Sequence, residues 1–141
     1  MLKTYALETK GNGLIDVTPM AEAALAESGV ADGLLLVSVP HSTAAVTVVS
    51  PWDPLGLEDV HDEICRLVPT RVDFKHQHDT PQDAAGHVKA ALVGHSRMFF
   101  VYDRKLGLGH SQRIFFWEFD GPRSRTIHVK VLRDGAPVTL R

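Results

Sequence analysis

The sequence is nearly free of cysteine: Cys65 is the single thiol among 141 residues. One cysteine cannot form an intramolecular disulfide, so we expect a chain that folds in a reducing compartment such as the cytoplasm. Cys65 lies in an apolar-periodic run, and this placement predicts a buried structural thiol. The CxxC and HExxH spacings of local zinc motifs are also missing, so any metal site must be assembled from distant segments.

Long apolar runs, an excess of one charge and glycine-rich phosphate loops are missing too. The longest apolar runs, such as residues 33–39, are far shorter than the roughly 20 residues of a membrane helix. Lysine and arginine number 15 against 17 acidic residues, a net charge of −2, which argues against a basic surface for nucleic acid or membranes. No glycine-rich loop joins a strand to a helix, which argues against nucleotide-binding folds. We therefore expect no nucleic-acid partner and no membrane partner.

What is present fits one globular domain over residues 1–141, with 44% apolar and 23% charged residues. Helical spacing and end signals predict helices over about residues 19–28, from Pro54 to before Pro69, and from an Asp83 cap to before Gly94. Alternating or β-branched runs predict strands in LKTYALETK, LIDV, GLLLVSVP, STAAVTVVS, MFFVYD, SQRIFFWEFD and SRTIHVKVL. This order favours an α+β domain with antiparallel strand pairs.

Histidine is abundant, and five of the eight histidines fall in loops or near element ends: His41, His76, His78, His87 and His110. Neutral imidazole binds zinc and exchanges protons near neutral pH. His76 and His78 project to the same side of an extended chain, where they either bind one ion together or remain solvated. Asp83 and His87 share one helix face, where the carboxylate could hold a divalent ion or orient a catalytic histidine.

A second polar segment is the glycine-containing turn KLGLGHSQR. Gly109 permits a close approach of the backbone, and Ser111, Gln112 and Arg113 supply a hydroxyl, an amide and a guanidinium. Together these groups suit a phosphate or a carboxylate. The alternative is an ordinary hairpin corner.

Three separated segments carry a resemblance: HSTAAVTV, then HxHD with DAAGHVKAAL, then LGLGHSQRIFFWEFDGPRSR. In this order and spacing they resemble the YjbQ-like proteins, a group also labelled secondary thiamine-phosphate synthase. The resemblance covers nearly the whole chain. It implies an α+β fold with an antiparallel β-sandwich-like core and flanking helices, assembled as a homotrimer with sites near subunit boundaries.

The resemblance also implies a pocket containing His41, a loop histidine, His87 and Asp83. The spacing to His87 favours His76 as the loop histidine, whereas the following aspartate favours His78. Two segments depart from the family pattern. The Asn-Glu-Asn run before Asp53 is replaced by residues 49–52, and the Gly-Thr-Trp-Gln turn reads GHSQ at residues 109–112.

The resemblance implies a transferase that joins a pyrimidine diphosphate to a thiazole phosphate and releases pyrophosphate. The rival hypotheses are metal-assisted hydrolysis and non-catalytic binding of a phosphorylated or anionic metabolite. We expect zinc or magnesium as the cofactor. The candidate catalytic residues are His41, Asp83 and His87; the candidate metal ligands are His41, His76, His78 and His87; the candidate substrate-binding residues are Gly109, Ser111, Gln112, Arg113 and Arg123.

Overall fold

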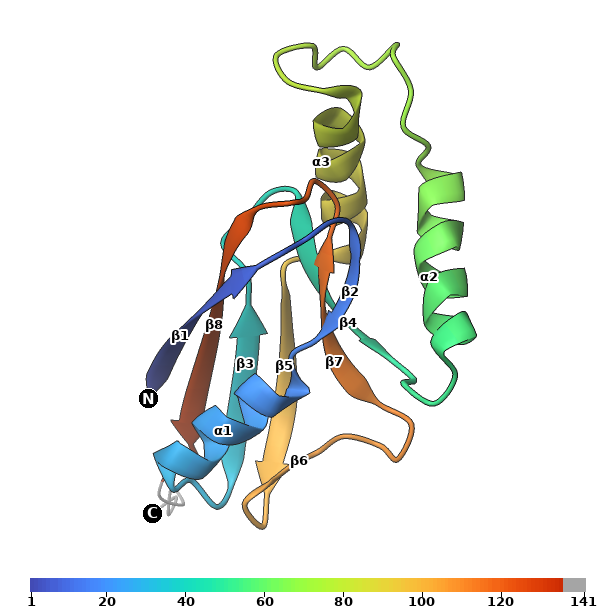
Figure 1. Cartoon of the computed structure of the whole chain (residues 1–141). Coiled ribbons are helices and arrows are strands. Elements are labelled where there is room, and N and C mark those ends of the chain that lie inside the picture. Colours follow the sequence, from blue (N-terminus) through green and yellow to red (C-terminus); the bar gives the residue numbers. More distant parts are fainter. Residues whose placement is uncertain (136–141) are drawn as a thin grey trace, which may run out of the picture.

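The computed structural model describes residues 1–135, which form three helices and eight strands (Figure 1). The helices are α1 (Thr18–Ser28), α2 (Pro54–Leu67) and α3 (Pro81–Val93). The strands are β1 (Leu2–Glu8), β2 (Gly13–Asp16), β3 (Gly33–Ser38), β4 (Ala44–Val49), β5 (Ser96–Tyr102), β6 (Lys105–Leu106), β7 (Arg113–Glu118) and β8 (Ser124–Arg133). None of these helices is long and apolar enough to cross a membrane.

Two antiparallel sheets enclose the main core, which confirms the predicted α+β, sandwich-like architecture. The larger sheet has the order β1-β8-β3-β5-β6, and the smaller sheet has the order β2-β7-β4. Strand side chains alternate between faces, so Leu35 and Val129 of the larger sheet meet Val46 and Phe116 of the smaller one. Helix α1 adds Ala21 to the same apolar cluster.

The opposite face of the smaller sheet is covered by α2 and α3. Trp117 and Phe119, from β7 and the turn after it, form an apolar cluster with Ile64 of α2 and Ala90 of α3. Gly86 allows α3 to approach closely, because a Cβ atom there would lie 3.3 Å from the Phe119 carbonyl oxygen. This contact holds the first turns of α3 beside the end of β7.

The structure corrects two details of the sequence-based prediction. Helix α3 begins at Pro81, and its N-cap is Thr80 rather than Asp83. The Thr80 hydroxyl accepts the Asp83 backbone N–H at 3.1 Å. N–H groups in the first turn have no partner within the helix, so a hydroxyl just before that turn caps one of them. The two-residue strand β6 is too short to give a period-two pattern, so the sequence does not predict it.

A buried ion pair joins β7 to β8 at the end nearest α3. The Glu118 carboxylate is fully buried, and Arg125 donates to both of its oxygens. Thr9, just after β1, donates to Glu118 Oε1 at 2.7 Å, and Thr43, just before β4, accepts from Arg125 at 2.9 Å. Four segments distant in sequence therefore meet at one pair of charges.

The ionised form of Glu118 is favoured despite its burial. Burial alone would raise the pKa of Glu118, but the hydrogen bonds from Arg125 and Thr9 outweigh it and hold the pKa below its ordinary value. A carboxyl with a lower pKa in the folded state stabilises the fold above its unfolded pKa of about 4.3. That contribution is lost as the pH falls through the folded-state value.

We expect Glu118→Gln to lower the free energy of unfolding by about 3–5 kcal/mol at pH 7, because Arg125 would remain buried without a counter-charge. Glu27→Gln is the matched control, since Glu27 pairs with Lys3 on the surface, and it should cost less than about 1 kcal/mol. Denaturant titrations measure both. The difference between parent and Glu118→Gln should shrink as the pH falls below about 4; equal costs for the two variants would contradict this account.

Candidate functional site

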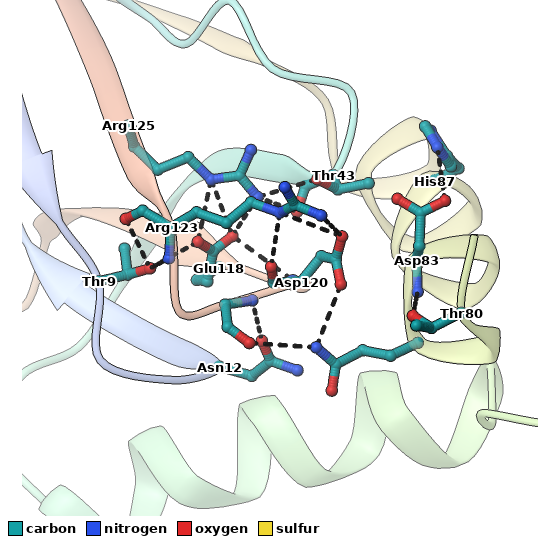
Figure 2. Close-up of polar contacts among 12 residues, drawn as sticks. Thr9, Asn12, Thr43, Thr80, Asp83, His87, Glu118, Asp120, Arg123 and Arg125 are labelled. Carbon is teal, nitrogen blue, oxygen red and sulfur yellow. Dashed lines mark hydrogen bonds and ion pairs between the residues drawn. The ribbon is translucent and has the colours of Figure 1, made fainter.

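The carboxylate of Asp83 is the centre of a histidine cluster. Asp83 and His87 lie one turn apart on α3, and His76 comes from the loop between α2 and α3. Asp83 Oδ2 lies 2.9 Å from His76 Nε2 and 3.3 Å from His87 Nε2. Figure 2 shows Asp83 directed at His87 from the first turn of the helix, with Thr80 below it.

The structure resolves the alternative between the two loop histidines. His76 contacts Asp83, whereas His78 is exposed and belongs to no cluster of possible metal ligands within the described part of the chain. The ligating atoms of His76, Asp83 and His87 all lie within 4.8 Å of one another. The predicted same-side pairing of His76 and His78 is thus replaced by a pairing of His76 with α3.

Asp83 is well prepared to carry a negative charge. Its side chain is only 8% exposed, and burial raises its pKa. The hydrogen bond from His76 and the charges of both histidines act in the opposite direction and leave the pKa below its ordinary value. The carboxylate is therefore ionised at neutral pH and available as a ligand or hydrogen-bond acceptor.

Two hollows border this cluster. A cavity of about 620 Å³ lies on the loop side, lined by His76, His87 and the apolar side chains of Phe74, Ala84 and Val88. A polar hollow of about 300 Å³ lies on the sheet side and is lined by His41, Ser42, Asp79, Asp83, Arg123 and Arg125. A small molecule with one apolar part and one charged part would have suitable surroundings here.

His41 borders the polar hollow but is not part of the Asp83 cluster. Its Nε2 accepts the backbone N–H of Thr126 at 2.8 Å, so that nitrogen is already engaged. Burial and the nearby Arg125 charge lower the pKa of His41, which favours the neutral ring. The structure thus separates His41 from His76 and His87, the two predicted site residues that contact Asp83.

The segment after β7 supplies groups that the sequence analysis did not select. Asp120 is buried and receives hydrogen bonds from Arg123 at 2.7 Å and from Gln82 at 3.2 Å (Figure 2). The Arg123 side chain remains 46% exposed, so part of its guanidinium faces the hollow. The sequence signal for these groups was the distinctive EFDGPRSR segment, and of its residues only Arg123 was predicted to bind substrate.

A family model for UPF0047 protein YjbQ-like sequences matches residues 3–134. The chain belongs to this family. A UPF0047 protein of Methanocaldococcus jannaschii is 38% identical over 135 residues, covering 95% of this chain and 96% of that protein. YugU of Bacillus subtilis is 37% identical over 135 residues, covering 94% and 99%.

Solved YjbQ-like structures share the fold. A hypothetical protein of Aeropyrum pernix K1 superposes with a TM-score of 0.89 at 35% identity, covering 95% of this chain and 99% of that chain. A protein of the family from Clostridium acetobutylicum has a TM-score of 0.86 at 37% identity, covering 92% and 99%. The resemblance found in the sequence motifs is therefore confirmed.

In this YjbQ-like chain the glycine turn lies away from Asp83. Arg113 begins β7 and Glu118 ends it, so the turn and the histidine cluster occupy opposite ends of that strand (Figure 1). The two segments that depart from the family pattern meet at the turn. Trp52 donates to the Ser111 hydroxyl at 3.1 Å, and its ring lies 5.2 Å from that of His110.

The same turn borders a further cavity of about 530 Å³. Within the turn the Gln112 side chain accepts the Gly109 N–H at 2.8 Å, and Arg113 pairs with Asp16. Of the five predicted substrate-binding residues, only Arg123 lies beside the Asp83 cluster. The remaining four, Gly109, Ser111, Gln112 and Arg113, stand together at the other end of β7.

Removing His76 should raise the pKa of the Asp83 carboxyl, because one hydrogen bond that lowers it is lost while the burial remains. Carbon-13 NMR titration of the Asp83 carboxyl in chelator-treated protein measures this directly. His78→Ala is the matched control and should leave the titration of Asp83 unchanged. A pKa that is the same in His76→Ala and in the parent would show that the contact is absent in solution.

Proposed function

We propose that this protein is a metal-dependent enzyme that hydrolyses a small phosphorylated or anionic metabolite. The metal is held by His76, Asp83 and His87. The convergence of one imidazole nitrogen from each histidine on a buried carboxylate carries the proposal. The charged groups of the adjoining hollow then bind the anionic part of the substrate.

The donor atoms fit zinc in number, type and spacing. Zinc ligands at about 2.0–2.2 Å in tetrahedral geometry lie roughly 3.3 Å from one another. Asp83 Oδ2 already lies 2.9 Å and 3.3 Å from the two histidine nitrogens. Three protein ligands leave a fourth position for water or substrate, as in catalytic zinc sites. Two imidazoles also favour zinc over magnesium, which prefers oxygen ligands.

A bound zinc ion would lower the pKa of a coordinated water and polarise a phosphoryl or carbonyl oxygen. The chain's own residues bind and orient the substrate. Arg123, held in place by Asp120, offers the exposed part of its guanidinium to an anionic group. Phe74 and Val88 provide an apolar surface on the opposite side. Neutral His41 borders the hollow, and because its Nε2 accepts the Thr126 N–H, its own proton is on Nδ1, from which it can donate.

We further propose that the protein assembles as a homotrimer in which the glycine turn of one subunit faces the histidine cluster of another. Within one chain, β7 separates these two sets of residues, so a small substrate cannot contact both. The outer face of the larger sheet supports assembly. Leu34, Leu36, Met98, Phe100 and Leu132 form adjacent pairs there, although a solvated sheet face normally carries polar residues.

Thiamine-phosphate synthase activity is the second candidate. Its support is the position of Arg123 at the polar hollow, since both precursors carry phosphate. Departure of pyrophosphate calls for magnesium, however, and the two imidazoles of the Asp83 cluster are poor ligands for that ion. A binding protein without catalysis would use the same groups and is distinguished by the absence of turnover.

We expect untagged, chelator-stripped protein to bind one zinc ion per chain, as measured by competition with a chromogenic chelator. His76→Ala and His87→Ala should each weaken this binding at least 100-fold, because each removes one of three ligands. His78→Ala and His41→Ala are the controls and should bind as the parent does. Loss of zinc binding in His41→Ala but not in His76→Ala would contradict the proposed ligand set.

The zinc-loaded protein should hydrolyse at least one member of a panel of phosphate esters, phosphoanhydrides and carboxylate esters. Arg123→Ala should raise KM about tenfold or more through loss of the anion contact, with a smaller effect on kcat. His87→Ala should be inactive. Turnover of the two thiamine precursors with magnesium that is lost in His87→Ala, without hydrolysis of any member of the panel, would favour the synthase and contradict hydrolysis at this site.

The subunit arrangement is tested with the same substrate. If the two halves meet across a subunit boundary, a mixture of His87→Ala and Arg113→Ala chains should regain activity after subunit exchange, because some boundaries then contain two intact halves. Neither variant alone should be active. A mixture that stays inactive, although sedimentation shows exchanged trimers, would contradict the shared site.

A further inference from the structure

A second cluster of reactive side chains lies between α2 and α3, apart from the proposed metal site. Cys65 Sγ lies 3.6 Å from His61 Nε2 on the same helix and 3.5 Å from Lys89 Nζ on α3. The sequence predicted a buried structural thiol at Cys65, but the residue is partly exposed and has two polar neighbours.

The direction of the hydrogen bonds around His61 is fixed by a tryptophan. The Trp117 indole N–H can only donate, and it lies 2.9 Å from His61 Nδ1. Nδ1 is therefore the acceptor, so the neutral ring carries its proton on Nε2, the nitrogen that faces Cys65. Burial, and after it the Lys89 charge, lowers the pKa of His61 and favours this neutral form. The Asp62 charge acts in the opposite direction and is outweighed. His61 thus donates to the sulfur and cannot accept a proton from it.

Lys89 supports this site independently, because it lies on α3 and not on the helix that carries Cys65. It is only 4% exposed, and within residues 1–135 it forms no ion pair with a carboxylate. Its ammonium group lies over the Phe119 ring at 5.8 Å, and the sulfur is its one hydrogen-bond partner in this part of the chain. A buried ammonium group is stabilised by a negatively charged neighbour, and the sulfur is the atom in position to supply that charge.

We propose that Cys65 is a site of covalent modification by soft electrophiles and peroxides, at which the N–H groups of Lys89 and His61 stabilise negative charge on the reacting sulfur. Both neighbours present N–H groups to the sulfur, an arrangement that suits a thiolate and offers a thiol proton no acceptor. With hydrogen peroxide, the sulfur attacks one oxygen: the S–O bond forms and the O–O bond breaks. Sulfur is oxidised by two electrons to a sulfenic acid, the peroxide is reduced by two electrons, and its second oxygen leaves as hydroxide, which the buffer protonates to water.

Alkylation by iodoacetamide at pH 7 tests the proposal, and intact mass reports it without ambiguity because the chain has one cysteine. The reference is an unstructured peptide with the sequence of residues 62–68. An ordinary thiol is only about 3% ionised at pH 7, so a thiolate in the folded protein should react about fivefold faster than the peptide, despite its lower intrinsic nucleophilicity. Lys89→Met should react more slowly than the peptide, whereas Lys89→Arg keeps the charge and should retain most of the rate.

Partial burial can only slow alkylation, so a folded parent that reacts no faster than the peptide would overturn the proposal. This comparison stands even if Lys89→Met does not fold, which circular dichroism would reveal. In the peroxide experiment, parent protein treated with hydrogen peroxide and dimedone should gain one dimedone adduct, and Cys65→Ser should gain none. Rapid alkylation without the adduct or any oxygen addition would contradict the oxidation step.

Discussion

The ion pair between Glu118 and Arg125 is the contact on which the arrangement of the site depends. Both side chains are buried, and their hydrogen bonds to Thr9 and Thr43 fix the ends of β1, β4, β7 and β8 relative to one another (Figure 2). Two charges in an apolar interior are stable only when every partner is in place. The end of β7 is therefore held in one position, and the chain that leaves it starts from a fixed point.

The positions of the functional groups depend on this fixed end of β7. The turn after β7 places Arg123 at the polar hollow. Asp120 of the same turn holds the Arg123 guanidinium and also contacts Gln82 of α3. The close approach of Gly86 to the same turn seats α3 against the sheet. Asp83 then faces inward from the first helical turn, and its carboxylate contacts His76 of the loop. The packing around one buried ion pair thus positions the carboxylate of Asp83.

Periodicity and end signals predict most of the fold and part of the site. Pro54 and Gly94 mark helix ends, and the four-residue spacing of Asp83 and His87 predicts their shared face. The path of the loop is not periodic, so the sequence left His76 and His78 as alternatives. Nor could the sequence predict the ion pair between Glu118 and Arg125, although Arg125 shares the buried face of β8 with Ile127. Their pairing depends on which strands become neighbours.

The spatial separation of the glycine turn from the histidine cluster also depends on tertiary structure. Nothing local in LGLGHSQRIFFWEFDGPRSR indicates that β7 runs straight between its two polar ends. A straight strand of six residues spans about 20 Å, too far for one small substrate. The sequence-based hypotheses gave both ends a role at one substrate, whereas within a single chain the two ends lie apart.

The central claim is that His76, Asp83 and His87 form a metal site. The most direct test is a crystal structure of the protein grown with one equivalent of zinc, with anomalous data collected on both sides of the zinc absorption edge. We predict one anomalous peak per chain, about 2.0–2.2 Å from His76 Nε2, His87 Nε2 and Asp83 Oδ2. A peak at other residues, or a cluster that keeps its direct hydrogen bonds without a peak, would contradict the claim.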